Sequence, residues 1–163
     1  MTTCEELHDL LADAELPHPE RMRRIQELTG VEDCVTQALS DALAAHDWDA
    51  FEMYLWAAFH HPTSSMTPVL CGALRLKSRS VPNEDALQVL AEIKDPASLT
   101  CLREVLYWQP EWDEFDHIGV KALWAVDAVG TVEARRLVAE AAELGSDAVR
   151  DWARRKLSQH PTG

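Results

Sequence analysis

The chain repeats itself at a spacing of 36 residues. Ala50, Ala86 and Ala122 are 36 residues apart, and the residues that follow each alanine stay in register. In each copy the first, fourth, fifth and eighth positions are apolar, which is one face of a helix. A second segment of each copy keeps the same register, at Met66, Leu102 and Val138. Each copy therefore predicts a pair of amphipathic helices.

One such helix pair cannot bury both of its faces, so the three pairs must stack on one another. The sequence therefore predicts an all-α fold, an α-solenoid of antiparallel helix pairs in repeats of about 36 residues. Chance is the alternative, because a periodicity of 3.6 residues makes apolar positions coincide often. No alternating strand pattern is present. The expected helices are 3–14, 18–29, 31–46, 48–60, 66–78, 84–94, 97–109, 113–129, 132–144 and 147–158.

Capping residues mark several of these helix starts. Thr3 and Glu6 have the spacing of a capping box, and Asp95 and Thr67 each precede a proline. Asn83 and Thr131 are found at similar starts. We expect a single α-helical domain over 1–163. It consists of divergent N-terminal helices at 1–46, the repeats and a capping helix at 47–158, and a tail at 159–163.

Two segments resemble the HEAT-repeat superfamily, in particular its short bacterial repeats known as phycobilisome-lyase-like. Residues 118–134 look like a first helix, its glycine turn at Gly130 and the start of the second helix. Residues 147–157 are similar to the ending of such a repeat, with an acidic residue, a Val-Arg pair, an alanine and a terminal leucine. The resemblance covers 83–158 and weakens over 48–80, where His60-His61-Pro62 replaces the glycine turn. Residues 1–46 show no match.

This resemblance implies a right-handed array of antiparallel helix pairs with one face that binds another macromolecule, most often a protein. A small minority of relatives are lyases or DNA-alkylation glycosylases. Small acidic bacterial members are recurrently immunity proteins that neutralise a toxin domain. The family supports no single activity, because the scaffold carries many functions.

The charge of the chain is −13, from 28 acidic and 15 basic residues. Residues 1–50 carry 12 acids and 3 bases, and 110–130 carry 5 acids and 1 base, whereas the other segments nearly cancel. An acidic surface repels phosphates, so nucleic acid and anionic membranes are disfavoured and a basic protein partner is favoured. With no run of 18 apolar residues and an acidic N-terminus, we expect no membrane association and a cytoplasmic protein.

No motif in the sequence predicts catalysis. The four cysteines stand at least 30 residues apart, so we expect reduced, mostly buried thiols and no zinc site. No HxxxH or HExxH spacing brings two histidines to one helix face, and no GxxxxGK[ST] or GxGxxG segment is present to hold phosphates. We therefore expect no catalytic residue, no metal and no cofactor.

The segment 108–117 combines three aromatic residues with four carboxylates. Aromatic rings anchor interfaces, and carboxylates steer a basic partner. We therefore predict partner-binding residues here, namely Trp108, Glu111, Trp112, Asp113, Glu114, Phe115 and Asp116. The alternative is that Trp108 and Phe115 close the core while the acids cap the next helix.

A second predicted partner-binding patch lies at the start of the first recognisable repeat. It comprises Asp47, Trp48, Asp49 and Glu52. Stacked repeats place equivalent positions on one ridge, so Asp49 is expected beside Asp85, one repeat further on. The alternative is that these acids only complement the dipole of their own helix.

The leading hypothesis is a non-enzymatic protein-binding module, most concretely an acidic immunity protein that neutralises a basic toxin domain. A nuclease is a natural target, because its phosphate-binding cleft is cationic. One rival is a HEAT-like lyase, DNA-repair-type enzyme or small-ligand binder with Trp108, Trp112, Trp124 and Asp127 around a pocket. A DNA-acting enzyme would use the basic residues Arg150, Arg154, Arg155 and Lys156, with Arg135 and Arg136 nearby. The alternative is that the bases of the last helix complement its negative C-terminal end. The other rival is a scaffold subunit of a larger complex.

Overall fold

The computed structural model describes residues 2–159, and this range contains ten α-helices and no strand. The helices are α1 (Thr3–Ala12), α2 (His18–Glu27), α3 (Glu32–Ala45), α4 (Trp48–His60), α5 (Thr67–Arg75), α6 (Asn83–Ile93), α7 (Leu99–Leu106), α8 (His117–Val129), α9 (Val132–Leu144) and α10 (Asp147–Gln159). Short 3₁₀ turns at Ser64–Met66 and Pro96–Ser98 precede α5 and α7. All ten expected helices are confirmed. Residues 160–163 of the expected tail lie outside the described residues.

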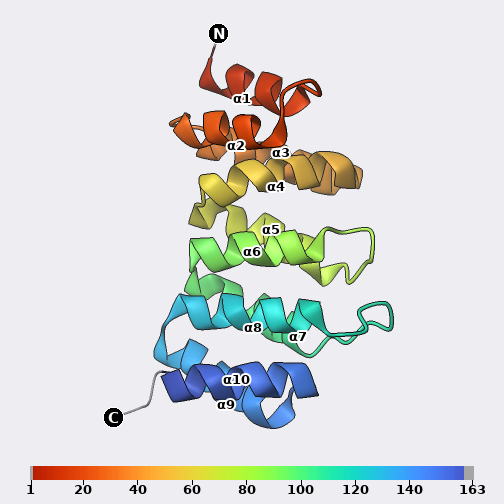
Figure 1. The fold of residues 1–163 in the computed structure, drawn as a ribbon, viewed down its shortest axis with the longest axis vertical. Helices are drawn as coiled ribbons and strands as arrows, with labels where there is room; N and C mark the ends of the chain where they lie inside the picture. The colour runs from red at the N-terminus through yellow and green to blue at the C-terminus, as the bar shows by residue number, and fades with distance from the viewer. Residues whose placement is uncertain (1, 160–163) are drawn as a thin grey trace.

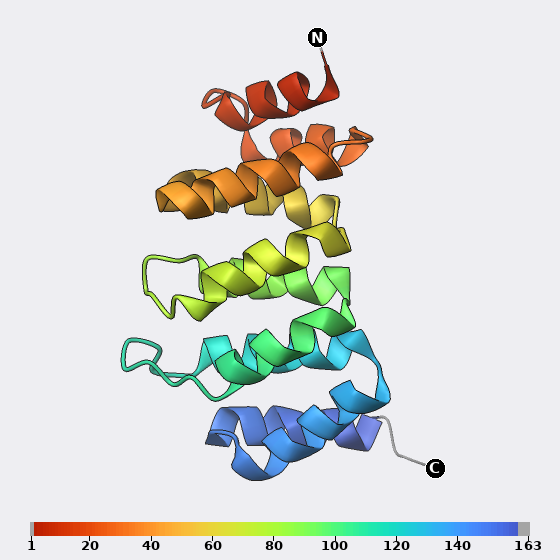
Figure 2. The same cartoon turned by 180° about the vertical axis from the view of Figure 1, so that it is seen from behind.

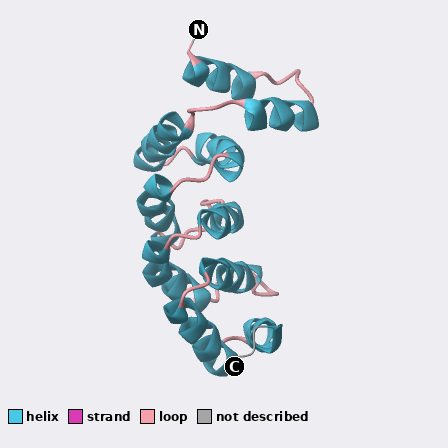
Figure 3. Cartoon of the chain, turned by 90° about the vertical axis from the view of Figure 1, so that its left-hand side faces the viewer, coloured by secondary structure: helices cyan, strands magenta, loops and turns pink. Residues whose placement is uncertain are grey.

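The helices form two rows along the long axis of the molecule (Figure 1). The even-numbered helices α2, α4, α6, α8 and α10 each contact the next even-numbered one, and α3, α5, α7 and α9 form the other row, seen from behind in Figure 2. The stack is bent, and the even-numbered row lies on the inside of the bend (Figure 3). None of the described helices is long and apolar enough to cross a lipid bilayer.

Positions that are 36 residues apart meet the same core. Phe51, Leu87 and Leu123 on α4, α6 and α8 are all fully buried. The equivalent positions of the facing row are also buried, at Met66 in the 3₁₀ turn before α5, Leu102 in α7 and Val138 in α9. The periodic apolar positions are therefore the ones that the two rows bury against each other.

Helix starts agree with the sequence in part. Thr131 caps α9 by accepting from Ala134 N at 3.1 Å, and Asp95 caps the turn before α7 by accepting from Ala97 N at 2.9 Å. The expected capping box at Thr3 and Glu6 is wrong by one residue, because Thr2 and Glu5 form it. Asn83 and Thr67 are not caps either. Both are buried first helical residues, and the Thr67 hydroxyl donates to Asp95 at 2.8 Å.

The departure from the repeat pattern at His60-His61-Pro62 has a structural reason. His61 is only 9% exposed, and its Nε2 lies 2.7 Å from the carbonyl oxygen of Ile25 at the end of α2. The imidazole therefore links the end of α4 to the divergent N-terminal helices, a role that a glycine turn cannot fill.

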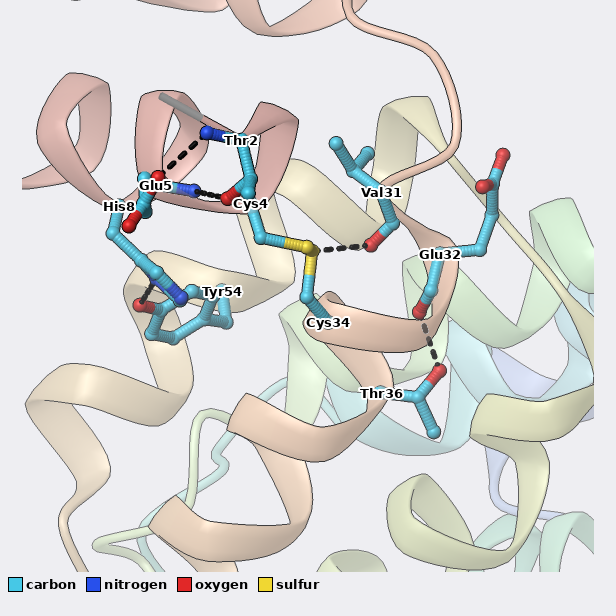
Figure 4. Close-up of a disulfide and its surroundings, with 9 residues drawn as sticks. All are labelled: Thr2, Cys4, Glu5, His8, Val31, Glu32, Cys34, Thr36 and Tyr54. Atoms are coloured by element: carbon cyan, nitrogen blue, oxygen red, sulfur yellow. Dashed lines mark hydrogen bonds between the residues drawn. A yellow bond between two sulfur atoms is a disulfide. The ribbon is translucent and has the colours of Figure 1, made fainter.

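The cysteines are paired, so the expectation of reduced thiols is wrong. One disulfide joins Cys4 on α1 to Cys34 on α3 (Figure 4), and the other joins Cys71 on α5 to Cys101 on α7. In each disulfide the two cysteines are 30 residues apart in the sequence, and one further helix lies between the two helices that the bond joins. Disulfides are rare in the cytosol and common in secreted and periplasmic proteins, so the two bonds weigh against a cytoplasmic location.

Candidate functional site

An open groove of about 430 Å³ lies at one edge of the stack, where α4, α6 and α8 begin. The protruding loops 76–82 and 107–116 lie at this edge (Figure 1). The groove brings Trp48, Asp49 and Glu52 of one predicted patch together with Trp112 of the other. Asp85 lines it too, so the expected neighbourhood of Asp49 and Asp85 is confirmed.

Carboxylates outnumber cations in this groove. Glu84 pairs with Lys121 at 3.3 Å. By contrast, the side chains of Asp49, Glu52 and Asp85 form no hydrogen bond or ion pair with another residue of 2–159. Burial raises the pKa of the half-buried Asp85, because removal from water disfavours the charged carboxylate, while Lys121 acts in the opposite direction. The groove thus holds four carboxylates against two cations, Lys121 and Arg79, and keeps an excess of negative charge.

Aromatic rings form part of the wall. The side chain of Trp112 is 39% exposed, and Trp108 meets it edge-on with ring centroids 5.7 Å apart. Trp108 is half-buried and packs against the core, as the alternative interpretation of this segment expected. Trp48, also half-buried, stacks on His46 at 5.5 Å. Trp112 is therefore the ring with the most surface to offer in the groove.

Two carboxylates of the 108–117 segment serve the start of α8. Asp113 accepts from the backbone N–H groups of His117 and Ile118, at 3.0 and 2.9 Å. Asp116 accepts from Gly119 N at 3.1 Å and from the Ser146 hydroxyl at 2.5 Å. With 8% of its surface exposed, Asp116 has little area left for a partner, and burial raises the pKa of its carboxyl.

The remaining predicted residues point elsewhere. Glu111, Glu114 and Phe115 line a separate cavity of about 470 Å³ on the side of the turn between α9 and α10. Phe115 is 67% exposed and does not close the core. Asp47 is exposed, and its carboxylate caps α4 through Ala50 N at 3.1 Å. Of the residues in the two predicted patches, four therefore line the same groove: Trp48, Asp49, Glu52 and Trp112.

The sequence interpretation missed two aromatic residues of the inner row. Trp56 is half-buried and Phe59 is 43% exposed, and both line a cavity of about 220 Å³ that adjoins the groove at Asp85. They follow Glu52 at intervals of four and seven residues, so they lie on the same face of α4. This helical spacing from Glu52 was the feature of the sequence that could have predicted them. The aromatic surface continues along the inner row from α4 towards α2.

Three of the six basic residues near the C-terminus have a partner within the described chain. Arg150 pairs with Asp147, Lys156 lies 3.5 Å from Asp127, and the Arg155 guanidinium is 4.9 Å from the Trp152 ring centroid. Arg135, Arg136 and Lys156 line a cavity of about 550 Å³ with apolar neighbours. These contacts fit a helix end that is screened by local partners better than an open phosphate-binding face.

The described cavities do not bring together the four residues of the pocket proposed for the rival enzyme. None of the described cavities is lined by more than one of its four residues, since Trp112 lines the groove and Asp127 lines the 550 Å³ cavity. Trp124 instead packs edge-on against Trp152, with centroids 5.2 Å apart.

Metal ligands are not clustered in the part of the chain that the structure describes. Within residues 2–159, no group of three His, Cys, Asp or Glu side chains is placed to hold a metal ion. A scan against protein-family models and a search of curated proteins both find no match to this chain.

Proposed function

We propose that this protein is a non-enzymatic binding module that holds a basic protein partner in the groove at the start of α4, α6 and α8. The observation that carries the proposal is that three carboxylates, which form no ion pair within the described chain, share one groove with the exposed Trp112 ring. Unpaired carboxylates attract a cationic surface and raise the association rate, and a Trp ring supplies contact area that binding removes from water.

The scaffold of this proposal is a HEAT-like α-solenoid of antiparallel helix pairs. It is supported by the two rows of helices and by the burial of equivalent positions at 36-residue intervals. Bent stacks of this kind bind partners on their concave side. The groove, Trp56 and Phe59 belong to the even-numbered row, which is the inner one.

The most concrete partner is a toxin domain that this acidic protein neutralises. A toxin that cleaves nucleic acid must present a cationic cleft to the phosphates, and an acidic inhibitor can occupy that cleft. The partner is therefore proposed to be a basic nuclease domain encoded next to this protein.

The test compares a groove variant with a variant of equal charge. Asp49→Lys with Glu52→Lys changes the groove, whereas Asp9→Lys with Glu143→Lys makes the same change in charge at exposed positions that line no described cavity. Asp113 stays unchanged because its carboxylate caps α8. Each form is co-expressed with the neighbouring toxin domain, and its affinity for that domain is measured by titration calorimetry.

We expect the wild type and the remote variant to restore growth, and the groove variant to bind at least a hundredfold more weakly. Equal binding by both variants would locate the interface elsewhere. The absence of any complex between the wild type and the neighbouring domain would refute the proposed function.

A further inference from the structure

One cation of the chain itself already occupies the groove. The guanidinium of Arg79, on the loop 76–82, lies 5.8 Å from the centroid of the Trp112 ring. Arg79 is exposed and forms no hydrogen bond or ion pair with another residue of 2–159. It is therefore held in place chiefly by its contact with the ring, and its departure breaks no other polar interaction within that range.

A buried acceptor in the groove wall has no donor. Asn83 is 3% exposed, and its Nδ2 donates to the carbonyl oxygens of Ser78 and Val81 at 2.9 and 3.0 Å. These two bonds fix the orientation of the side-chain amide, because only the nitrogen can donate. The opposite atom, Oδ1, accepts no hydrogen bond from the described residues. A buried acceptor without a donor is costly, so a small rearrangement of the wall that brings a ligand N–H to Oδ1 is favoured.

We propose that the groove receives an arginine side chain of the partner, which takes the place that Arg79 holds over Trp112 in the free protein. This inference rests on the proposed function and names the chemical group that the groove recognises. The arginine brings its charge to Asp49, Glu52 and Asp85, its planar face to Trp112, and N–H donors to the wall that contains Asn83 Oδ1.

Guanidinium fits these features better than the ammonium of lysine. A guanidinium is planar, stacks on aromatic faces and carries five N–H donors in a fixed geometry, whereas an ammonium is a compact and strongly hydrated charge. Because a guanidinium is more weakly hydrated than an ammonium, its removal from water into a half-enclosed groove costs less free energy. An arginine-rich segment should therefore bind more tightly than a lysine-rich segment of the same charge.

The experiment measures the binding of labelled hexa-arginine and hexa-lysine peptides to the full chain by fluorescence anisotropy. We expect hexa-arginine to bind at least tenfold more tightly. Trp112→Leu should remove this preference while leaving hexa-lysine binding within twofold, and melting curves check that the variant is folded. In NMR spectra of the wild type, the side-chain amide signals of Asn83 should shift with hexa-arginine only.

A matched pair of variants tests the role of Arg79. Arg79→Gln and Lys77→Gln remove the same charge from exposed positions of the same loop. Both should raise the affinity for either peptide, but Arg79→Gln should raise the affinity for hexa-arginine at least threefold more than Lys77→Gln does. Equal effects of the two variants would refute the exchange of Arg79 for a ligand arginine.

Equal binding of the two peptides by the wild type, or a preference that survives Trp112→Leu, would refute guanidinium recognition. Binding of arginine methyl ester as tight as that of the peptide would make the groove a small-molecule site and overturn the choice of occupant. These outcomes are separable from the proposed function. If a neighbouring toxin domain bound through the acidic groove but its affinity did not change with Trp112→Leu, this inference would be refuted and the proposed function would stand.

Discussion

Single side chains decide where the helices of this molecule begin, and Asp116 is the clearest case. Its backbone has a φ of 52°, in the left-handed region that aspartate and asparagine tolerate better than most residues. Its carboxylate closes the start of α8 and reaches Ser146 before α10. One buried acid therefore sets both the end of the long loop 107–116 and its contact with the last helix pair.

The pH dependence of stability tests the burial of Asp116. Burial raises the pKa of the Asp116 carboxyl in the folded state above its value in the unfolded state. At a pH between these two pKa values, the folded state binds more protons than the unfolded state. The carboxyl therefore makes the wild type more stable as the pH falls through this range. Asp116→Asn keeps an acceptor and the left-handed backbone but cannot titrate. We expect the free energy of unfolding of the wild type, relative to that of Asp116→Asn, to increase from pH 7 to pH 4.

Urea unfolding at several pH values measures this difference. Asp116→Ala is the companion variant, because it removes the cap and should cost about 0.5–2 kcal/mol or more at every pH. A constant difference between wild type and Asp116→Asn across this range would show that the carboxyl does not have a raised pKa.

At the scale of helices, the two disulfides join elements that the chain separates by a whole helix. Cys71 and Cys101 are both buried, between α5 and α7 of the outer row. Cys4 and Cys34 are half-buried and hold α1 to α3, near the contact between His8 and Tyr54 (Figure 4). A cross-link of this kind stabilises the fold mainly because it restricts the unfolded chain.

Removal of the buried Cys71–Cys101 disulfide should therefore be costly. A loop of 30 residues predicts a loss of about 3–4 kcal/mol for the double variant Cys71→Ala with Cys101→Ala, when both proteins are unfolded under oxidising conditions. Chemical denaturation measures the difference, and alkylation followed by mass spectrometry counts the free thiols of the wild type. Four modified cysteines in oxidised, denatured wild-type protein would contradict the pairing.

The same scale shows how far the sequence could predict this structure. Local periodicity places all ten helices, because each buries one continuous face. The helix expected at 113–129 begins only at His117, because capping by Asp113 and Asp116 depends on loop geometry that periodicity does not encode. The disulfides were missed because spacing along the chain does not report which helices stack, although both pairs share a separation of 30 residues.

The groove was predictable in its parts but not as a whole. The 36-residue register places Asp49 beside Asp85, and stacking brings both into the groove. Trp112 reaches them through the ten-residue loop 107–116, which ends in the capping contacts of Asp113 and Asp116 and whose course helical periodicity does not encode. For the same reason Phe115 and Glu114, only a few residues further on, line a different cavity.

On the scale of the whole molecule, stability depends on contacts between neighbouring helices, both along each row and across the two rows. The helix α6 lies in the middle of the inner row and contacts both α4 and α8. If the proposed solenoid is correct, we expect each helix to be stabilised mainly by its immediate neighbours. Damage to a central helix therefore removes support on both sides and separates the two ends of the groove, which α4 and α8 supply.

Leu90→Asp tests this dependence. Leu90 on α6 is 1% exposed, so the substitution puts an unpaired charge into the core. This costs several kcal/mol, which is comparable with the whole stability of a domain, about 5–15 kcal/mol. Leu144→Asp is the matched control, because Leu144 is 66% exposed at the end of α9. We expect Leu90→Asp to abolish the cooperative melting transition and the control to melt within a few degrees of the wild type. Hydrogen exchange then locates the loss. A variant that retains protection in α4 and α8 while α6 alone exchanges would show that the rows do not transmit stability from helix to helix.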